Sequence, residues 1–135
     1  MSELISSNQK QQLIQAATEV RLRAYAPYSQ FLVGAALLAE DGQVYSGCNV
    51  ENAAYPEGTC AEAGAIAAMI AGGARKIVAI AVVGSGERLI SPCGGCRQKI
   101  AEFSGELTPV LLSSVVCADT ATYTIGELLP ESFLL

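Results

Sequence analysis

The sequence predicts a three-layer α/β fold, with helices on both faces of one β-sheet, as a single domain over residues 1–135. Two observations carry this prediction. Segments with helical and with strand-like patterns alternate along the chain, and residues 77–83 form an unbroken apolar run rich in Val and Ile. Such a run suits a central strand that is covered on both faces. With 51% hydrophobic and 16% charged residues, the chain is long and apolar enough to bury a core.

Helix signals occur at several points of the chain. Ser6 and Gln9 have capping-box spacing before a helical apolar pattern, and Pro27 forbids its continuation. Pro92 precedes another candidate helix and is favourable near a helix start, where its missing N–H has no partner to lose. The segments expected to be helical are residues 6–24, 60–71, 92–103 and 125–129.

Short apolar runs predict the strands of the sheet. The first two are joined at Asp41-Gly42, which favours an antiparallel hairpin, whereas residues 51–59 are rich in Asn, Pro and Gly and predict a loop. The expected strands are residues 31–39, 44–50, 76–84, 110–113 and 115–117.

Composition narrows the classes of partner. The formal net charge is −5 and no run of Lys or Arg occurs, which argues against a nucleic-acid strand as partner. No stretch reaches the roughly 18 continuous apolar residues of a membrane helix, and residues 1–12 are polar, unlike a signal peptide. We therefore expect a cytoplasmic protein without membrane or nucleic-acid partners. The low charge also favours surface buried between subunits.

Cysteine and histidine usage points to a metal. The chain has five cysteines and no histidine. An odd number of cysteines without a secretion signal favours metal binding or catalysis over disulfides. A site for a soft metal must then be built mainly from thiolates, and a general acid or base must be Glu, Asp, Lys, Tyr or Cys.

Three cysteines are candidate zinc ligands because each stands near the start of a predicted helix. Cys93 and Cys96 are three residues apart, so the first turn of a helix brings them together, and Cys60 would supply a third thiolate. Catalytic zinc takes three protein ligands and keeps one position open for water. Structural zinc and a redox dithiol remain alternatives, and Cys48 and Cys117 are interpreted as small core residues that could in principle complete a site with four ligands.

Glu62 is the candidate proton carrier beside such a metal. A carboxylate next to zinc-bound water can take a proton and pass it to a leaving group. Two residues on an ideal helix point to opposite faces, so Glu62 and Cys60 can share a pocket only if Cys60 caps the helix. Two helix N-termini would offset part of the negative charge of three thiolates, and Arg97 could offset more by donating to a sulfur.

The chain resembles the cytidine deaminase family over nearly its whole length, including the zinc-deaminase signature with Cys-x-Glu and Pro-Cys-x-x-Cys. The blocks that carry the resemblance are Ala26-Pro27-Tyr28-Ser29, Phe31, Val33-Gly34-Ala35-Ala36, Gly47-Cys48-Asn49-Val50-Glu51-Asn52-Ala53, Cys60-Ala61-Glu62, Ser91-Pro92-Cys93-Gly94-Gly95-Cys96-Arg97-Gln98 and Leu128-Leu129-Pro130. The resemblance implies a mixed five-stranded sheet and a Zn²⁺-dependent hydrolase acting on C–N bonds of cyclic amidines. It also implies that cytidine and 2′-deoxycytidine are deaminated to uridine and 2′-deoxyuridine in pyrimidine salvage.

The resemblance further implies substrate contacts and an assembly. Family members of this length are similar homotetramers whose sites lie near subunit interfaces. The implied contacts are Phe31 stacking on the pyrimidine, Asn49 and Glu51 on the ribose hydroxyls, the backbone at Ala61 and Ser91 on the base edge, Glu62 on the ring nitrogen and leaving amine, and Phe133 near a neighbour's site.

Two departures from the family pattern leave the substrate open. Ala63 stands where relatives often have Arg after Cys-Ala-Glu, which removes a potential donor to the thiolates. Residues 55–59 read Tyr-Pro-Glu-Gly-Thr where relatives commonly have Tyr-Gly-Leu-Thr, and Glu57 could favour an amine-bearing nucleoside. The alternatives are therefore a deaminase of a modified cytosine nucleoside such as blasticidin S and, in another class, a structural zinc module that binds a protein.

Overall fold

A computed structural model describes residues 5–116 and 119–135 of the chain. Its single five-stranded sheet has the order β2-β1-β3-β4-β5. The strands are β1 Val33–Ala39, β2 Val44–Cys48, β3 Ile77–Gly84, β4 Pro109–Ser114 and β5 Ala121–Thr124. The helices are α1 Ser7–Arg21, η1 Tyr55–Glu57, α2 Ala61–Ala71, α3 Gly94–Glu102 and α4 Ile125–Leu128.

The sheet is mixed, as predicted. Strand β1 is antiparallel to both β2 and β3, β3 is parallel to β4, and β4 is antiparallel to β5. The predicted hairpin is confirmed, and Gly42 provides its turn with a φ of +81°, a conformation that glycine adopts without strain.

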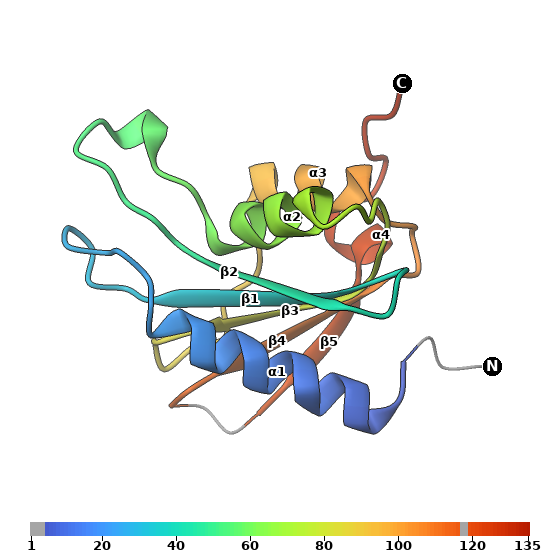
Figure 1. Cartoon of the computed structure of the whole chain (residues 1–135), viewed down its shortest axis with the longest axis horizontal. Helices are drawn as coiled ribbons and strands as arrows, with labels where there is room; N and C mark the ends of the chain where they lie inside the picture. Colours follow the sequence, from blue (N-terminus) through green and yellow to red (C-terminus); the bar gives the residue numbers. More distant parts are fainter. Residues whose placement is uncertain (1–4, 117–118) are drawn as a thin grey trace.

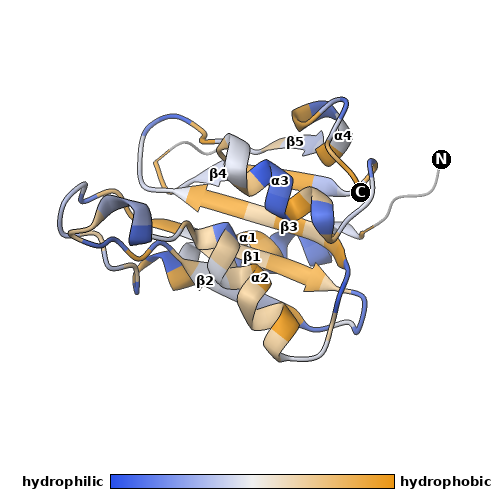
Figure 2. Cartoon of the chain, turned by 90° about the horizontal axis from the view of Figure 1, so that it is seen from above, coloured by the Kyte–Doolittle hydropathy of each residue, from blue (hydrophilic) through white to orange (hydrophobic). Residues whose placement is uncertain are grey.

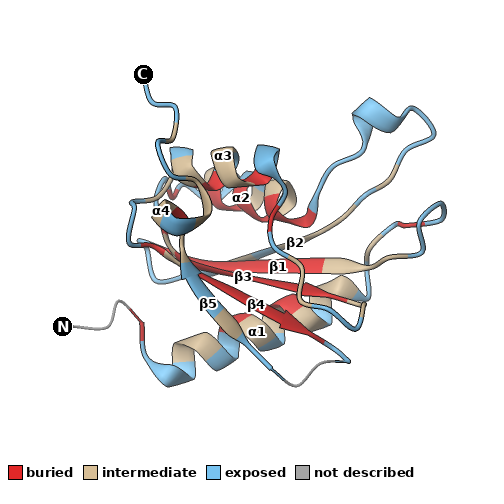
Figure 3. Cartoon of the chain, turned by 180° about the vertical axis from the view of Figure 1, so that it is seen from behind, coloured by how far each residue is buried: buried red, intermediate tan, exposed pale blue. Residues whose placement is uncertain are grey.

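Helices cover the two faces of the sheet unequally (Figure 1). Helix α1 packs alone on one face through Leu13 and Ala17, next to alternate residues of β1, β3 and β4. The other face carries α2, α3 and α4, which contribute Met69, Ile100 and Ile125 to a second buried cluster. Figure 2 shows the apolar colour concentrated on the central strands, and Figure 3 shows the same strands buried. The three-layer prediction is confirmed.

Close backbone approach holds the helices on the sheet. A Cβ added at Gly34 would lie 1.9 Å from the carbonyl oxygen of Ala17 in α1. A Cβ added at Gly47 would lie 2.4 Å from the backbone nitrogen of Ala65 in α2. Only glycine fits at these two positions, so each helix sits directly on the strand backbone.

The last strand corrects the sequence prediction. Val115 and Val116 lie outside any strand, and Cys117 lies outside the described residues. The edge strand is instead β5, whose four residues are half-buried or exposed and are held by their pairing with β4. Its Ala-Thr-Tyr-Thr sequence is not an apolar run, because an edge strand of this kind is only partly covered.

None of the helices formed by the described residues is long and apolar enough to span a membrane.

Candidate active site

The three candidate ligands lie at two helix N-termini. Cys60 is the N-cap of α2, with extended φ and ψ of −82° and 159°. Cys93 is the N-cap of α3, with φ and ψ of −66° and 171°, and Cys96 follows in the first turn of α3. The condition that Cys60 precede its helix is therefore met. Both helices direct the positive ends of their dipoles at the cysteines, which favours thiolates there.

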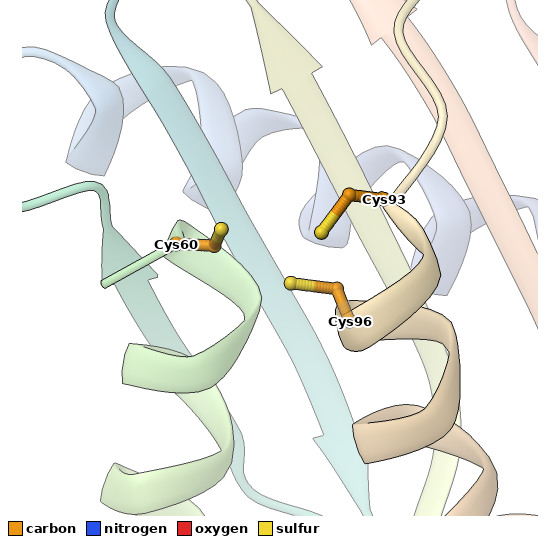
Figure 4. Close-up of side chains that lie close together, drawn as sticks. All are labelled: Cys60, Cys93 and Cys96. Carbon is orange, nitrogen blue, oxygen red and sulfur yellow. The ribbon is translucent and has the colours of Figure 1, made fainter. Parts of the chain in front are cut away.

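The three Sγ atoms all lie within 4.8 Å of one another (Figure 4). Tetrahedral Zn–S bonds of about 2.3 Å would place two sulfurs about 3.8 Å apart, so the cluster suits a zinc ion after a small contraction. Among the described residues the cluster holds these three ligands; Cys48 is half-buried on β2 and is not part of it. Cys117 lies outside the described residues, so its interpretation as a small core residue or as a fourth metal ligand stays a prediction.

The thiols differ in their acidity. Burial raises the pKa of Cys60 and, more strongly, that of Cys96. The pKa of Cys93 is lowered, first by the backbone N–H of Cys96. A soft cation that binds here must displace the protons of Cys60 and Cys96, so binding would release protons.

Glu62 is buried beside this cluster. It is only 4% exposed, although it lies in the first turn of α2. Burial raises the pKa of its carboxyl, while the charge of Lys99 and local hydrogen bonds lower it. A carboxyl that holds its proton more tightly than usual is suited to accept a proton and pass it on.

A cavity of about 600 Å³ opens over the cysteine cluster. Its wall combines apolar side chains with a few polar groups, as is typical of small-molecule sites. The lining residues come from the loop before β1 and the first residue of β1, the segment 49–62 and the turn before α3: Tyr28, Ser29, Val33, Asn49, Val50, Glu51, Asn52, Tyr55, Gly58, Thr59, Cys60, Ala61, Glu62, Ile90, Ser91 and Cys93.

Comparison with known proteins decides the family. The sequence model of the cytidine and deoxycytidylate deaminase zinc-binding region matches residues 7–111. The chain belongs to this deaminase family. It is 47% identical to a cytidine deaminase of Sporosarcina psychrophila over 91% of this chain and 90% of the relative. It is 46% identical to one of Halalkalibacterium halodurans over 92% of this chain and 93% of the relative.

Solved structures agree with the family assignment. The crystal structure of a cytidine deaminase from Burkholderia pseudomallei superposes with a TM-score of 0.86 at 44% identity, covering 96% of this chain and 100% of that one. A cytidine deaminase from Mycobacterium tuberculosis superposes with a TM-score of 0.81 at 37% identity, covering 93% and 98%. The match to the family's zinc-binding region spans the cysteine cluster, and the three clustered sulfurs are consistent with the Zn²⁺ of this family.

Asn49 and Glu51 line the cavity but also bind protein backbone. The Asn49 amide accepts from the N–H of Val33 at 2.9 Å and donates to the carbonyl of Phe31 at 2.9 Å. The Glu51 carboxylate accepts from the backbone N–H groups of Tyr28 and Ser29. These bonds fix the direction of both side chains at the cavity wall.

Two predicted aromatic contacts are not on the wall of the cavity. The ring of Phe31 lies against the backbone at Gly84 and Gly86, where added Cβ atoms would be 3.2 Å and 3.1 Å from ring carbons. Phe133 is 69% exposed, and its carbonyl accepts from the side chain of Gln98. The roles of Phe31 on a pyrimidine and of Phe133 at a neighbour's site stay predictions.

The expected bond from Arg97 to a sulfur is corrected. Its guanidinium donates to the carbonyl of Pro92 at 2.7 Å, the carbonyl of Leu128 at 2.8 Å and the hydroxyl of Ser91 at 2.9 Å. These oxygens are stronger acceptors than sulfur, and no hydrogen bond to a thiol was found for Arg97 among the described residues. Arg97 therefore braces the turn that carries Cys93 against α4.

Several residues of the cavity wall had no role predicted from the sequence. Tyr28 and Ser29 stand in a block that carries the family resemblance, and their contact with Glu51 spans more than twenty residues of chain. The positive φ of Gln30, +57°, is a backbone feature that sequence alone did not reveal. Tyr55, Gly58 and Thr59 line the cavity, whereas Glu57 is not among the lining residues.

Proposed function

We propose that the protein is a zinc-dependent hydrolase that converts cytidine and 2′-deoxycytidine, with water, into uridine and 2′-deoxyuridine plus ammonia. The observation that carries the proposal is the buried carboxyl of Glu62 beside three clustered sulfurs, on the wall of a cavity large enough for a nucleoside. Relatives named as cytidine deaminases support the choice of substrate.

Zinc held by Cys60, Cys93 and Cys96 would supply an acidified water as the nucleophile. Glu62 takes the proton of the attacking water as it adds to C4 of the pyrimidine. The same carboxyl delivers this proton to ring N3. It then takes the second proton of the former water from the new C4 hydroxyl and delivers it to the amine, so that the C4–N bond breaks, ammonia leaves and the carbonyl of uridine forms. Its raised pKa suits both steps, because the group must hold the proton between them.

The polar part of the cavity wall at Asn49 and Glu51 suits a ribose. Each polar atom of the Asn49 amide uses one hydrogen bond internally, which leaves one N–H and one lone pair for a ligand. Glu51 offers only acceptor sites when ionised. A sugar hydroxyl can donate to Glu51 and its neighbour can accept from Asn49, while the backbone at Ala61 and Ser91 reads the edge of the base.

A homotetramer remains part of the proposal. Three large side chains of the cavity wall are strongly exposed, Tyr28 at 55%, Val50 at 48% and Tyr55 at 81%, and so is Tyr25, which pairs with Val50, at 57%. Figures 1 and 3 show the segment 49–59 extending beyond the sheet. Burial of these side chains against further copies of the chain would complete the site, with Phe133 approaching a neighbouring cavity. A cytoplasmic location and a role in pyrimidine salvage belong to the same proposal.

The test is ammonia release from a panel of substrates. The zinc-loaded protein is incubated with cytidine, 2′-deoxycytidine, blasticidin S, cytosine, cytidine monophosphate and adenosine. We expect the two free cytosine nucleosides to react fastest. Preference for blasticidin S would favour the modified-nucleoside alternative, for which the position of Glu57 off the cavity wall gives no support.

A second arm separates catalysis from a structural zinc module. Glu62→Gln should retain zinc and lose turnover, whereas Glu102→Gln, at an exposed site near the end of α3, should change neither. Near-normal turnover of Glu62→Gln would overturn the assigned role. A structural module would lose nothing in either variant.

A further inference from the structure

The hydroxyl of Ser29 joins two residues expected to contact the substrate. It donates a hydrogen bond to Oε2 of Glu51 and accepts one from the backbone N–H of Phe31 at 3.0 Å. One oxygen atom therefore connects the carboxylate to the start of the segment that enters β1. Ser29 itself lines the cavity.

Three donors from one short turn converge on the Glu51 carboxylate. The N–H groups of Tyr28 and Ser29 reach Oε1 at 2.9 Å and 3.2 Å, and the Ser29 hydroxyl holds Oε2. An isolated Glu side chain rotates freely, so hydrogen bonds to both of its oxygens fix the plane of the carboxylate. The pKa of Glu51 is lowered, first by the Ser29 hydroxyl, as expected for donors that stabilise the ionised form.

The backbone presents these donors without help from the substrate. Pro27 begins the turn, Gln30 ends it with a φ of +57°, and the N–H of Gln30 donates to the carbonyl of Ala26 at 2.9 Å. Successive N–H groups in such a turn form a concave anion-binding nest. The turn is tied to the segment carrying Glu51, because the N–H of Glu51 donates to the carbonyl of Tyr25 at 2.8 Å.

We propose that Ser29 is a positioning residue, which orients the Glu51 carboxylate toward a single sugar hydroxyl of the nucleoside. An ionised carboxylate has about four acceptor positions, and the turn occupies three of them. One position is left to face the cavity. This inference rests on the proposed function for the identity of the ligand and goes beyond it in assigning Ser29.

The kinetic test compares Ser29→Ala and Ser29→Thr with the exposed control Ser46→Ala on β2, all zinc-loaded. Substrates are cytidine, 2′-deoxycytidine and 3′-deoxycytidine. We expect Ser29→Ala to lower kcat/KM for cytidine about tenfold, mainly through KM, and Ser29→Thr to restore most of the loss. The loss should disappear for the analogue that lacks the hydroxyl bound by Glu51. An equal loss on all three substrates, or no loss, would overturn the proposal.

A double-mutant cycle tests whether Ser29 acts through Glu51. If it does, the double variant Ser29→Ala/Glu51→Gln should have the same kcat/KM for cytidine as Glu51→Gln alone. If the fold-loss of kcat/KM in the double variant equalled the product of the two single losses, the two residues would act separately and the proposal would be contradicted.

A measurement independent of turnover completes the test. The Glu51 carboxyl is titrated by ¹³C NMR in the wild type and in Ser29→Ala. Its pKa should rise toward the ordinary value of 4.5 in the variant; an unchanged pKa would overturn the positioning role. Failure of the wild type to deaminate any cytosine nucleoside would refute the proposed function, while the NMR result would still decide the role of Ser29.

Discussion

Gly47 controls where the metal-bearing helix sits, so Gly47→Ala should damage the site from a distance. Gly47 pairs with Ala35 within the sheet and lies beneath the first turns of α2. A Cβ at this position would be 2.4 Å from the nitrogen of Ala65 and 2.6 Å from the carbonyl oxygen of Ala61. Both are backbone atoms of a helix, so no side-chain rotation can relieve the clash.

The required movement follows from these distances. Raising the shortest contact from 2.4 Å to an ordinary 3.4 Å takes 3.4 − 2.4 = 1.0 Å. Because its hydrogen bonds make α2 a rigid unit, the helix must lift as a whole and carry Cys60 and Glu62 with it. Overpacking of this kind costs about 1–3 kcal/mol of folding free energy. A displacement of about 1 Å at reacting groups can lower the rate roughly 100-fold.

The assay combines urea unfolding of the zinc-loaded protein with kcat/KM for cytidine and with zinc content. The matched control is Gly105→Ala, where an added Cβ would come no closer than 4.0 Å to Thr108. We expect loss of stability, zinc retention and activity in Gly47→Ala only. Wild-type stability together with wild-type kcat/KM in Gly47→Ala would refute the reasoning, because the helix would then have absorbed the side chain without moving.

Three further predictions follow from other contacts. Removal of zinc by a chelator should abolish activity and leave far-UV circular dichroism nearly unchanged, because neither buried apolar cluster contains a candidate metal ligand. Loss of the helical signal would contradict this prediction. Arg97→Ala should lower kcat/KM about tenfold and speed zinc loss by releasing the turn before α3, with Arg97→Lys only partly restoring it; unchanged rate and zinc content would count against the brace. In the hairpin, the Tyr45 hydroxyl donates to Asp41 at 2.7 Å and lowers the pKa of that carboxyl. Tyr45→Phe should therefore be less stable than the wild type at neutral pH, and in urea titrations the difference should vanish as the pH falls through the lowered pKa of Asp41; a difference that persisted in acid would contradict the assignment.

Local chemistry in the sequence was sufficient for most secondary structure. The capping box at Ser6 and Gln9 is present in the structure, and the run that forms β3 is covered as its composition predicted. The edge strand β5 escaped prediction because its pairing with β4, and not its own residues, holds it in place. An apolar pattern in a sequence indicates a buried strand, whereas the four residues of β5 are half-buried or exposed.

What the sequence determined by itself is the chemistry available. Without histidine, a zinc site had to use thiolates, and the helix signals predicted that Cys60, Cys93 and Cys96 lie near helix starts. That Cys60 caps its helix was a requirement of the hypothesis, which the structure meets. That inference needed only neighbouring residues, since caps and first turns are local structures.

The tertiary structure decided which groups meet. Two helices distant in sequence, α2 and α3, bring the sulfurs within 4.8 Å of one another. Gly47 lets α2 lie directly on the strand backbone, as Gly34 does for α1. Arg97 donates to the carbonyl oxygen of Leu128 and not to a sulfur of the cysteine cluster, and the Ser29 hydroxyl donates to Glu51. Each of these hydrogen bonds joins segments that are distant in sequence, so it depends on how the segments pack. Spacing along a chain sets local geometry, whereas contacts between segments depend on the packing of the whole sheet and its helices.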